Sequence, residues 1–377
     1  MFKVSPLFGD HAILPIGKEL RIFGSADEGE VIRAQITAAD GTVTGGKLLY
    51  NAITRIISVT SYDGTAYEEG TDYALEGSRI VRLPGSRIPV LPRSRYCVPY
   101  TGKAETTWRC LPGKEMYAEV VNNVYEYQPR VTYEHADAWN DFVPAAMGDK
   151  LPRTKARLAG SKPLKIVFYG DSITAGWEAS GHDEMVINMQ TLEEQHVTCN
   201  IPPFMPTWVE LTTRALHSAY PAAEITKVNR GSGGATVGWG EKNAAQLVNP
   251  FCPDVMPLAF GMNGMRDDPA VYREKTENII RIVRESNPDC EVVLLSPMTA
   301  NREMLAFENH TVVQQENMLR EIAASLPGVA VAPVNEVFRT LEKRGKTYWE
   351  LTGNCINHPN DFSIRIYAQT LLAAMGE

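Results

Sequence analysis

The pattern of hydrophobic and polar positions changes near residue 150. Before that point, short β-branched stretches alternate with turn signals at 39–41 and 62–64, and no long helical period of about 3.6 residues occurs. The strands that this pattern predicts are residues 20–23, 30–37, 47–50 and 55–60. Short strands at regular spacing are typical of a β-sandwich or a jelly roll. We therefore expect residues 1–150 to form a smaller all-β accessory domain of the sandwich, jelly-roll-like type.

Beyond residue 160, apolar strands alternate with amphipathic helices. The predicted strands are 164–169, 223–228, 255–260, 291–295 and 329–332, and the predicted helices are 207–220, 240–248, 269–285, 311–326, 335–344 and 363–375. Such alternation is typical of a parallel sheet with helices on both faces. We expect residues 160–377 to form an α/β catalytic domain, joined to the first domain by a connection that contains proline and glycine.

A serine follows the first strand of this second region. The apolar run that starts at Lys165 ends in Gly170-Asp171-Ser172, which predicts a tight turn after a buried strand. Open α/β sheets bind their ligands just beyond the carboxyl ends of the strands. A serine hydroxyl at that place still needs a base to take its proton before it becomes nucleophilic. The rest of the chain must therefore supply a histidine and donors for the negative oxygen.

Three further segments contain such groups. The first reads Asn229-Arg-Gly-Ser-Gly-Gly234, the second Gly261-Met-Asn263-Gly, and the third contains His358 near the C-terminus. Glycine lets the backbone approach a substrate closely, and an asparagine amide donates hydrogen bonds without ionising. Taken singly, each segment could be an ordinary turn, a flexible loop or a surface histidine.

Together with Ser172, these segments resemble the sequence blocks of the SGNH/GDSL hydrolase superfamily over about residues 164–377. The resemblance implies a flavodoxin-like, three-layer α/β/α fold. It also implies that Ser172 is the nucleophile and His358 the general base. The backbone N–H of Gly234 and the side chain of Asn263 would then donate to the oxyanion.

The sequence departs from the family pattern in two places. Gly264 stands where an aspartate usually follows the asparagine, and Cys355 stands where an aspartate usually precedes the histidine by three residues. Neither the Cys355 thiol nor the amide of Asn354 is an obvious partner for an imidazolium. Three explanations stay open: a Ser–His dyad oriented by a backbone carbonyl, another acid such as Glu350 or Asp361, or degraded catalysis. We favour the dyad.

Composition and charge exclude several function classes. Lysine and arginine number 37 and aspartate and glutamate 45, giving a net charge of −8, which argues against nucleic acid or an anionic membrane as partner. No apolar run reaches the roughly 18 residues of a membrane span. The six scattered cysteines form no C-x-x-C pair, so zinc is not supported and we expect no cofactor. The glycine-rich loop at 231–234 lacks the G-x-G-x-x-G pattern of a nucleotide-binding oxidoreductase.

Localisation and assembly are less constrained by the sequence. The first residues lack the long apolar core of a signal peptide, so we expect a cytoplasmic protein, with a secreted mature form as the alternative. Nothing in the sequence decides the oligomeric state, and a homo-oligomer is one of the assemblies that it allows.

The substrate is inferred from two features. Residues 5–18 are similar to the start of sialate O-acetylesterases, which implies ester hydrolysis on a sugar. Trp177 and Trp208 could offer flat amphipathic faces to a sugar ring, with the core or a subunit contact as the alternative. Asp171 and Arg266 are further candidate substrate contacts.

We therefore expect a serine esterase that removes acetyl or other short acyl groups from a small-molecule or oligosaccharide ester. The alternatives are a lipase- or acylhydrolase-like esterase acting on another small ester, and a carbohydrate-binding protein whose hydrolase site has degraded.

Overall fold

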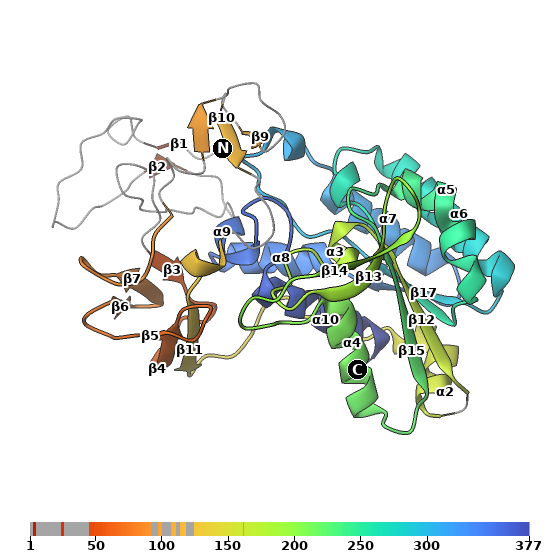
Figure 1. The fold of residues 1–377 in the computed structure, drawn as a ribbon, viewed down its shortest axis with the longest axis horizontal. Coiled ribbons are helices and arrows are strands. Elements are labelled where there is room, and N and C mark those ends of the chain that lie inside the picture. The colour runs from red at the N-terminus through yellow and green to blue at the C-terminus, as the bar shows by residue number, and fades with distance from the viewer. Residues whose placement is uncertain are drawn as a thin grey trace.

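The computed structural model describes residues 45–91, 124–160 and 162–376, together with the short strands at 3–4, 24–25, 97–99, 107–110 and 114–117. Its central element is a five-stranded parallel sheet (Figure 1). The strand order is β15-β12-β16-β17-β18, and the strands are β12 (Leu164–Gly170), β15 (Ile225–Gly231), β16 (Val255–Ala259), β17 (Glu291–Leu295) and β18 (Val329–Ala332). This is the flavodoxin-like order, with the first strand second from the edge, as the sequence predicts.

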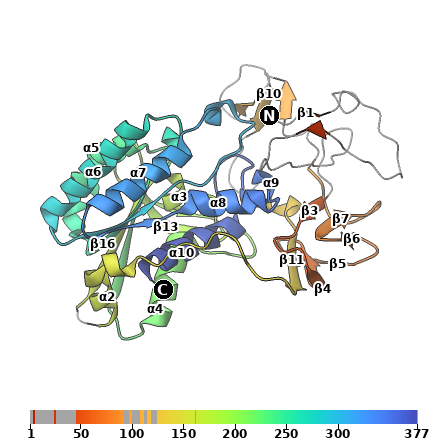
Figure 2. The same ribbon diagram turned by 180° about the vertical axis from the view of Figure 1, so that it is seen from behind.

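Helices cover both faces of the sheet, which gives the predicted three layers (Figures 1 and 2). One face carries α2 (Pro152–Leu158), α4 (Trp208–Ala219), α8 (Val334–Lys343) and α10 (Asp361–Met375). The other carries α5 (Val237–Leu247), α6 (Pro269–Ser286) and α7 (Val312–Ser325).

Strand β12 shows why its sequence is a continuous apolar run. Ile166 and Phe168 point into the core under α4 and α10, whereas Val167 and Tyr169 point into the core under α5 and α6. All four side chains are buried. A parallel strand that is covered on both faces needs apolar residues at every position.

The sequence did not predict the antiparallel hairpin of β13 (Asp183–Ile187) and β14 (Glu194–Thr198). Its strands carry charged side chains, and only Val186 and Ile187 are buried hydrophobic residues. A bridge between Ile187 and Ser232 attaches the hairpin to the loop after β15. The hairpin therefore lies beside one of the predicted site segments.

The described part of the N-terminal region forms small antiparallel sheets, which fits a smaller β domain. One sheet joins β11 (Arg130–His135), β4 (Ile53–Thr60) and β5 (Ala66–Tyr67), and another joins β3 (Gly45–Lys47), β7 (Arg79–Arg82) and β6 (Tyr73–Glu76). A small hydrophobic core between these strands contains Leu48, Val59, Tyr67, Tyr73, Ile80 and Ile88.

Further short strands lie in the same region. They are β1 (Lys3–Val4) paired with β2 (Gly24–Ser25), and the sheet of β8 (Cys97–Pro99), β10 (Lys114–Tyr117) and β9 (Thr107–Cys110). The predicted strands 20–23 and 30–37 and the predicted turn at 39–41 lie outside the described residues.

The β domain lies beside α8 and α9 (Tyr348–Leu351) in both views (Figures 1 and 2). Gln128, which follows the short helix η2 (Tyr125–Tyr127), donates from its side chain to the carbonyls of Trp349 and Thr352. Its Oε1 accepts from Asn360 Nδ2 at 3.0 Å. The segment that leads into β11 of the β domain is therefore bound to both sides of the loop that contains His358.

Within the described residues, no helix combines the length and apolar character that crossing a membrane requires.

Candidate active site

The sharp turn after β12 positions Ser172. A Cβ atom at Gly170 would lie 2.1 Å from Thr174 Oγ1 and 2.4 Å from the carbonyl oxygen of Ala259, so only glycine fits there. Ser172 then opens the short helix α3 (Ser172–Ala175), and Asp171 caps it by accepting from the N–H of Ile173 at 3.0 Å. The chain therefore turns abruptly and leaves Ser172 at the carboxyl end of the sheet.

Asp171 faces inward rather than toward a substrate. Its Oδ1 binds Ile173 N, its Oδ2 accepts from Met262 N at 3.3 Å, and the residue is only 2% exposed. Burial raises the pKa of its carboxyl to about 6. The prediction that Asp171 contacts the substrate is wrong, because both carboxylate oxygens are committed to holding the two site loops together.

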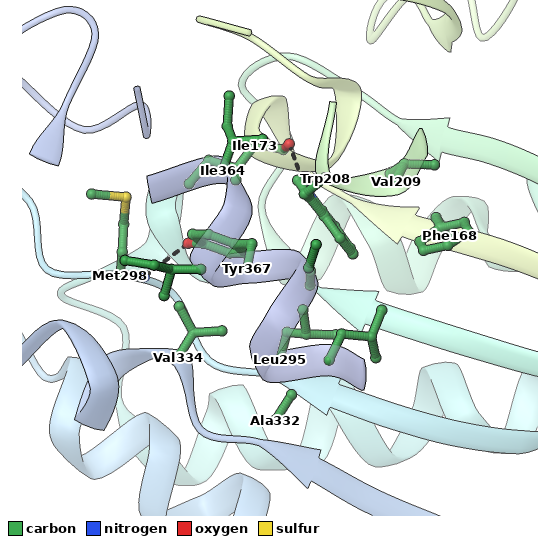
Figure 3. Packing of buried hydrophobic residues seen from close by; sticks show 14 of the residues in the cluster. Phe168, Ile173, Trp208, Val209, Leu295, Met298, Ala332, Val334, Ile364 and Tyr367 are labelled. Atoms are coloured by element: carbon green, nitrogen blue, oxygen red, sulfur yellow. Dashed lines mark hydrogen bonds between the residues drawn. The ribbon is translucent and has the colours of Figure 1, made fainter. Parts of the chain in front are cut away.

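Trp208 supports the same turn from below (Figure 3). Its indole N–H donates to the carbonyl of Ile173 at 2.8 Å, and its ring packs edge-on against Phe168. On the other side lies Tyr367, whose hydroxyl accepts from Met298 N at 3.0 Å. The prediction that Trp208 faces a sugar is wrong, because the side chain is 0% exposed and belongs to the core.

The structure brings Ser172 and His358 together across 186 residues of sequence. The Oγ of Ser172 lies 2.8 Å from Nε2 of His358, which is hydrogen-bond distance. His358 lies in the loop between α9 and α10, and Asn360 caps α10 just after it by accepting from Ser363 N at 3.1 Å. This geometry is what a base needs in order to take a serine proton.

Asn354 contacts the other imidazole nitrogen. Its Oδ1 accepts from the N–H groups of Ile356 at 2.9 Å, Asn357 at 3.0 Å and His358 at 3.2 Å. Its Nδ2 is therefore turned toward His358 and lies 3.0 Å from Nδ1. Asn354 is therefore a partner of the imidazole, contrary to the expectation from its sequence position.

Cys355 occupies the usual aspartate position, but it stabilises the conformation of the loop and does not orient the imidazole. Its φ is +59°, its carbonyl accepts from Asn301 Nδ2 at 2.9 Å, and its side chain is buried. Burial raises the pKa of the thiol, so the sulfur is neutral at ordinary pH.

The two acids suggested as substitutes have other partners. Glu350 accepts from the backbone N–H of Thr347 at 3.0 Å and pairs with Lys346. Asp361 accepts from the N–H of Ser180 at 3.1 Å and from its hydroxyl at 2.7 Å. Both carboxylates are occupied away from the His358 imidazole, so the suggestion that either orients it is wrong.

Sequence reasoning missed a third carboxylate, Glu178. Its Oε1 lies 3.9 Å from Nδ1 of His358, and its side chain is 3% exposed. Glu178 follows Ser172 by six residues, in the loop after α3. Nothing in the family pattern marks that position, so only the fold reveals its proximity to the histidine.

The carboxyl end of β15 packs closely onto the nucleophile turn. A Cβ atom at Gly231 would lie 2.1 Å from the backbone nitrogen of Ala175. The Asn229 side chain donates to the carbonyl of Thr174 at 2.9 Å and accepts from Gly231 N at 2.8 Å. These contacts explain why polar Asn229 is buried and why the end of this strand stays beside Ser172.

Gly234 and Asn263 lie in neighbouring loops at the same edge of the sheet. Gly234 is exposed and has a φ of +78°, a conformation that favours glycine. Asn263, in the short helix η5 (Met262–Gly264), is also exposed, and its Nδ2 donates to the carbonyl of Ala235 at 3.0 Å. A backbone N–H and a neutral amide are the kinds of donor that stabilise an oxyanion.

The two remaining candidate substrate contacts differ in their surroundings. Trp177 is half-buried, and its indole nitrogen lies 3.3 Å from where a Cβ atom at Gly233 would stand. Arg266 is exposed, but its guanidinium donates to the carbonyls of Glu308 and Leu305. Trp177 therefore borders the glycine loop, whereas Arg266 ties down a neighbouring loop, and a substrate role for either stays a prediction.

His182 is buried beside Trp177, and its burial should make the protein less stable in acid. Burial lowers the pKa of its imidazole to about 4 from an ordinary 6.5. Between those pH values, His182 is therefore protonated in the unfolded chain and neutral in the folded chain. The contribution of His182 to stability is fully present above about pH 6.5 and falls by about 3 kcal/mol as the pH drops toward 4, whereas the raised pKa of Asp171 acts in the opposite direction over this range.

The variant His182→Asn removes this titration and keeps a polar side chain that can form hydrogen bonds. Urea unfolding of both proteins at several pH values measures the effect. We expect a shallower loss of stability in the variant between pH 6.5 and 4. Parallel curves for the two proteins would show that His182 is not the acid-sensitive group.

In the parts of the chain that the structure describes, no three His, Cys, Asp or Glu side chains gather as a metal site. The chemistry that the described arrangement can perform uses a hydroxyl, an imidazole and neutral hydrogen-bond donors.

Comparison with solved structures finds similar folds at low identity. An α/β hydrolase enzyme from the metagenome of Lake Arreo, Spain, is 23% identical, with 56% of this chain and 95% of that chain covered and a TM-score of 0.42. An acetyl xylan esterase from Geobacillus stearothermophilus is 21% identical, with 56% and 94% covered and a TM-score of 0.41. A two-domain esterase active on acetylated mannans is 19% identical, with 60% and 52% covered and a TM-score of 0.44. No curated protein matches.

The family comparison is more decisive. The family model for GDSL-like lipases and acylhydrolases matches residues 168–362, just over half of the 377 residues. The matched segment begins in the strand before Ser172 and ends in the helix after His358. The match therefore includes both Ser172 and His358, and the chain belongs to the GDSL-like lipase/acylhydrolase family and is a carboxylic ester hydrolase.

Proposed function

We propose that this hydrolase removes acetyl or other short acyl groups from carbohydrates, with Ser172 as the nucleophile. The observation that carries the proposal is the 2.8 Å contact between Ser172 Oγ and His358 Nε2 at the carboxyl end of the sheet. A serine with a base at this distance, beside exposed backbone and amide donors, is suited to acyl transfer.

In the first half of the reaction, Ser172 Oγ attacks the ester carbonyl and its proton passes to His358 Nε2. The carbonyl oxygen becomes an oxyanion, which the N–H of Gly234 and the amide of Asn263 stabilise. His358 then returns the proton to the sugar oxygen, which leaves as a hydroxyl while the acyl group stays on Ser172. In the second half, water gives a proton to His358, attacks the acyl group and releases the acid, and Ser172 recovers its proton.

A short acyl group fits the surroundings of the glycine loop. The Sδ of Met189 lies 3.4 Å from where a Cβ atom at Gly234 would stand, and Trp177 borders Gly233 in the same way. The backbone of Met189 is anchored because its carbonyl accepts from the indole N–H of Trp239 at 3.2 Å. Met189 and Trp177 therefore border the proposed acyl site, and a short acyl group needs the least space between them.

The carbohydrate part of the proposal rests on two observations. The opening residues are similar to the start of sialate O-acetylesterases, as described above. Trp177 is half-buried beside the loop that would bind the oxyanion, where an indole face can stack on a sugar ring.

Removing the oxyanion donor of Asn263 provides a first test. We expect Asn263→Ala to lower kcat by roughly 10²–10³-fold, because one lost donor leaves the developing negative charge less stabilised. Asn263→Asp should be at least as impaired, since a carboxylate cannot donate and repels the oxyanion. The measurement is the steady-state hydrolysis of 4-nitrophenyl acetate. Because Asn263 is exposed, both variants should keep the thermal midpoint of the wild type, and activity close to wild type in both would remove Asn263 from the oxyanion site.

The substrate class is tested by acetate release from a panel of acetylated mono- and oligosaccharides, with Ser172→Ala as the control. Release that depends on Ser172 supports the proposal and ranks the sugars. Cleavage of 4-nitrophenyl acetate without release from any sugar would move the substrate to another small ester. Retained sugar binding without any hydrolysis would favour a carbohydrate-binding protein with a degraded site.

A further inference from the structure

We propose that Glu178 is the carboxylate that binds the Nδ1–H of His358 during acyl transfer, and that Asn354 holds the imidazole in a resting tautomer. The inference rests on the proposed function, because it concerns the base of that reaction. It replaces the Ser–His dyad with a Ser172–His358–Glu178 triad whose acid comes from the loop after the nucleophile.

The resting tautomer follows from the hydrogen bonds of Asn354. Its Oδ1 accepts from three backbone N–H groups of the loop, those of Ile356, Asn357 and His358. The amide can therefore present only Nδ2, a donor, to His358 Nδ1 at 3.0 Å. Nδ1 must accept this bond, and the imidazole proton then sits on Nε2, which donates to Ser172 Oγ at 2.8 Å.

That tautomer cannot act as the base. Nε2 must be free of its proton to accept the one from Ser172, so the reactive imidazole carries its proton on Nδ1. An Nδ1–H facing the amide of Asn354 would place two donors against each other. The reactive state therefore needs a hydrogen-bond acceptor near Nδ1 other than Asn354.

Glu178 supplies an acceptor at the right place. Its Oε1 is 3.9 Å from Nδ1, so a shift of about 1 Å would form a charge-assisted hydrogen bond of ordinary length. The side chain is 3% exposed, so water screens the interaction little. Such a small movement is available to an imidazole, since in free enzymes catalytic hydrogen bonds are often longer than in the substrate complex.

The fold makes dedicated space for this carboxylate. A Cβ atom at Gly353 would lie 2.8 Å from Glu178 Cβ and 3.1 Å from its Oε2, so a side chain at position 353 would displace it. Glu178 itself has a φ of +70°, which is uncommon for a residue other than glycine. Its carbonyl accepts a hydrogen bond from the hydroxyl of Tyr125, in the segment that leads into β11 of the β domain. The backbone conformation is thus held by contacts from two parts of the chain.

The other titratable groups near Glu178 and His358 are neutral at ordinary pH or form hydrogen bonds elsewhere. Cys355, Tyr125 and His182 lie within electrostatic range of Glu178. Burial raises the pKa of the Cys355 thiol and the Tyr125 phenol and lowers that of His182, so all three are uncharged near pH 7. Asp171 and His358 also interact electrostatically, but the carboxylate oxygens of Asp171 accept hydrogen bonds from Ile173 N and Met262 N.

The proton balance of the cycle is simple. The change from the resting to the reactive tautomer releases one proton from Nε2 to water and takes one from water at Nδ1, with no net change. The Ser172 proton then moves to Nε2 as Oγ bonds to the carbonyl carbon, and the positive imidazolium is paired with Glu178. Replacing the carboxylate that orients a catalytic histidine by its amide lowers turnover by up to about 10⁴-fold in a serine protease.

The test uses Glu178→Gln, Asn354→Asp and the double variant in the full-length protein. We expect Glu178→Gln to lower kcat by roughly 10³-fold with KM within about threefold, since the amide keeps the shape but loses the charge. Asn354→Asp places a carboxylate beside Nδ1 from the other side. In the Glu178→Gln background it should therefore recover at least about tenfold in kcat.

The outcomes separate this inference from the proposed function. Activity that survives in Ser172→Ala removes the proposed function and, with it, the triad. If Ser172→Ala is inactive and Glu178→Gln has a normal kcat, only the role of Glu178 is overturned. A loss in Glu178→Gln that Asn354→Asp does not relieve also overturns it, because a purely structural role for Glu178 would give that result.

Discussion

Ser172→Ala is expected to reduce ester hydrolysis to the level of the uncatalysed background. The Oγ atom that attacks the carbonyl is lost, and no other hydroxyl is held 2.8 Å from His358 Nε2 in the described residues. Loss of a catalytic serine lowers kcat by roughly 10⁶-fold in a serine protease. The measurement is the initial rate on 4-nitrophenyl acetate, with Ser286→Ala as a matched control. Ser286 caps the end of α6 by donating to the Val283 carbonyl, so its variant should keep normal activity.

The fold of the Ser172→Ala variant should survive. The Oγ of Ser172 makes one side-chain hydrogen bond, to His358, so the free energy of unfolding should change by about 1 kcal/mol or less. Circular dichroism and a urea titration check this. A fully folded variant that still turns over the ester would remove Ser172 from the mechanism.

The second large effect is expected for His358→Ala. Without the imidazole, the Ser172 hydroxyl keeps its proton and cannot attack, so the loss should approach that of Ser172→Ala. Residues that act as one unit are not additive. The double variant Ser172→Ala/His358→Ala should therefore be no slower than either single variant.

The control for this test is His217→Ala, which removes an exposed histidine of α4 and should leave the rate unchanged. Initial rates of the four proteins and the wild type on one ester complete the cycle. A double variant slower than both single variants by the product of their effects would mean that Ser172 and His358 act independently.

The sequence predicts the catalytic domain well because four of the five strands of its sheet are mainly apolar runs. The predicted strand 291–295 matches β17, and the predicted helix 269–285 matches α6 to within one residue. The largest difference is at β15, predicted over 223–228. The structure continues this strand to Gly231, because polar Asn229 and Arg230 are buried by specific partners. Arg230 pairs with Glu194 and lies over the ring of Phe251, contacts that no local pattern reveals.

The sequence predicts the site residues that belong to a motif. It does not predict the residues that reach the site only through the packing of loops. Ser172, His358, Gly234 and Asn263 come from the resemblance, and the fold brings their loops to one edge of the sheet. Glu178 and Asn354 carry no motif, since their proximity to His358 depends on how two loops with unusual backbone angles pack. For Trp208 the sequence left a buried and an exposed interpretation open, and only the packing against Phe168 and Tyr367 decides between them.

Covalent labelling of the nucleophile tests the central claim most directly, and it needs no knowledge of the natural substrate. The full-length protein is treated with a fluorophosphonate, which transfers a phosphonyl group to an activated serine, and the modified peptide is located by mass spectrometry. We predict one adduct, on Ser172, with loss of esterase activity in proportion to labelling and no adduct in Ser172→Ala or His358→Ala. An adduct on another residue, or undiminished labelling in Ser172→Ala, would contradict the claim that Ser172 and His358 form the active site.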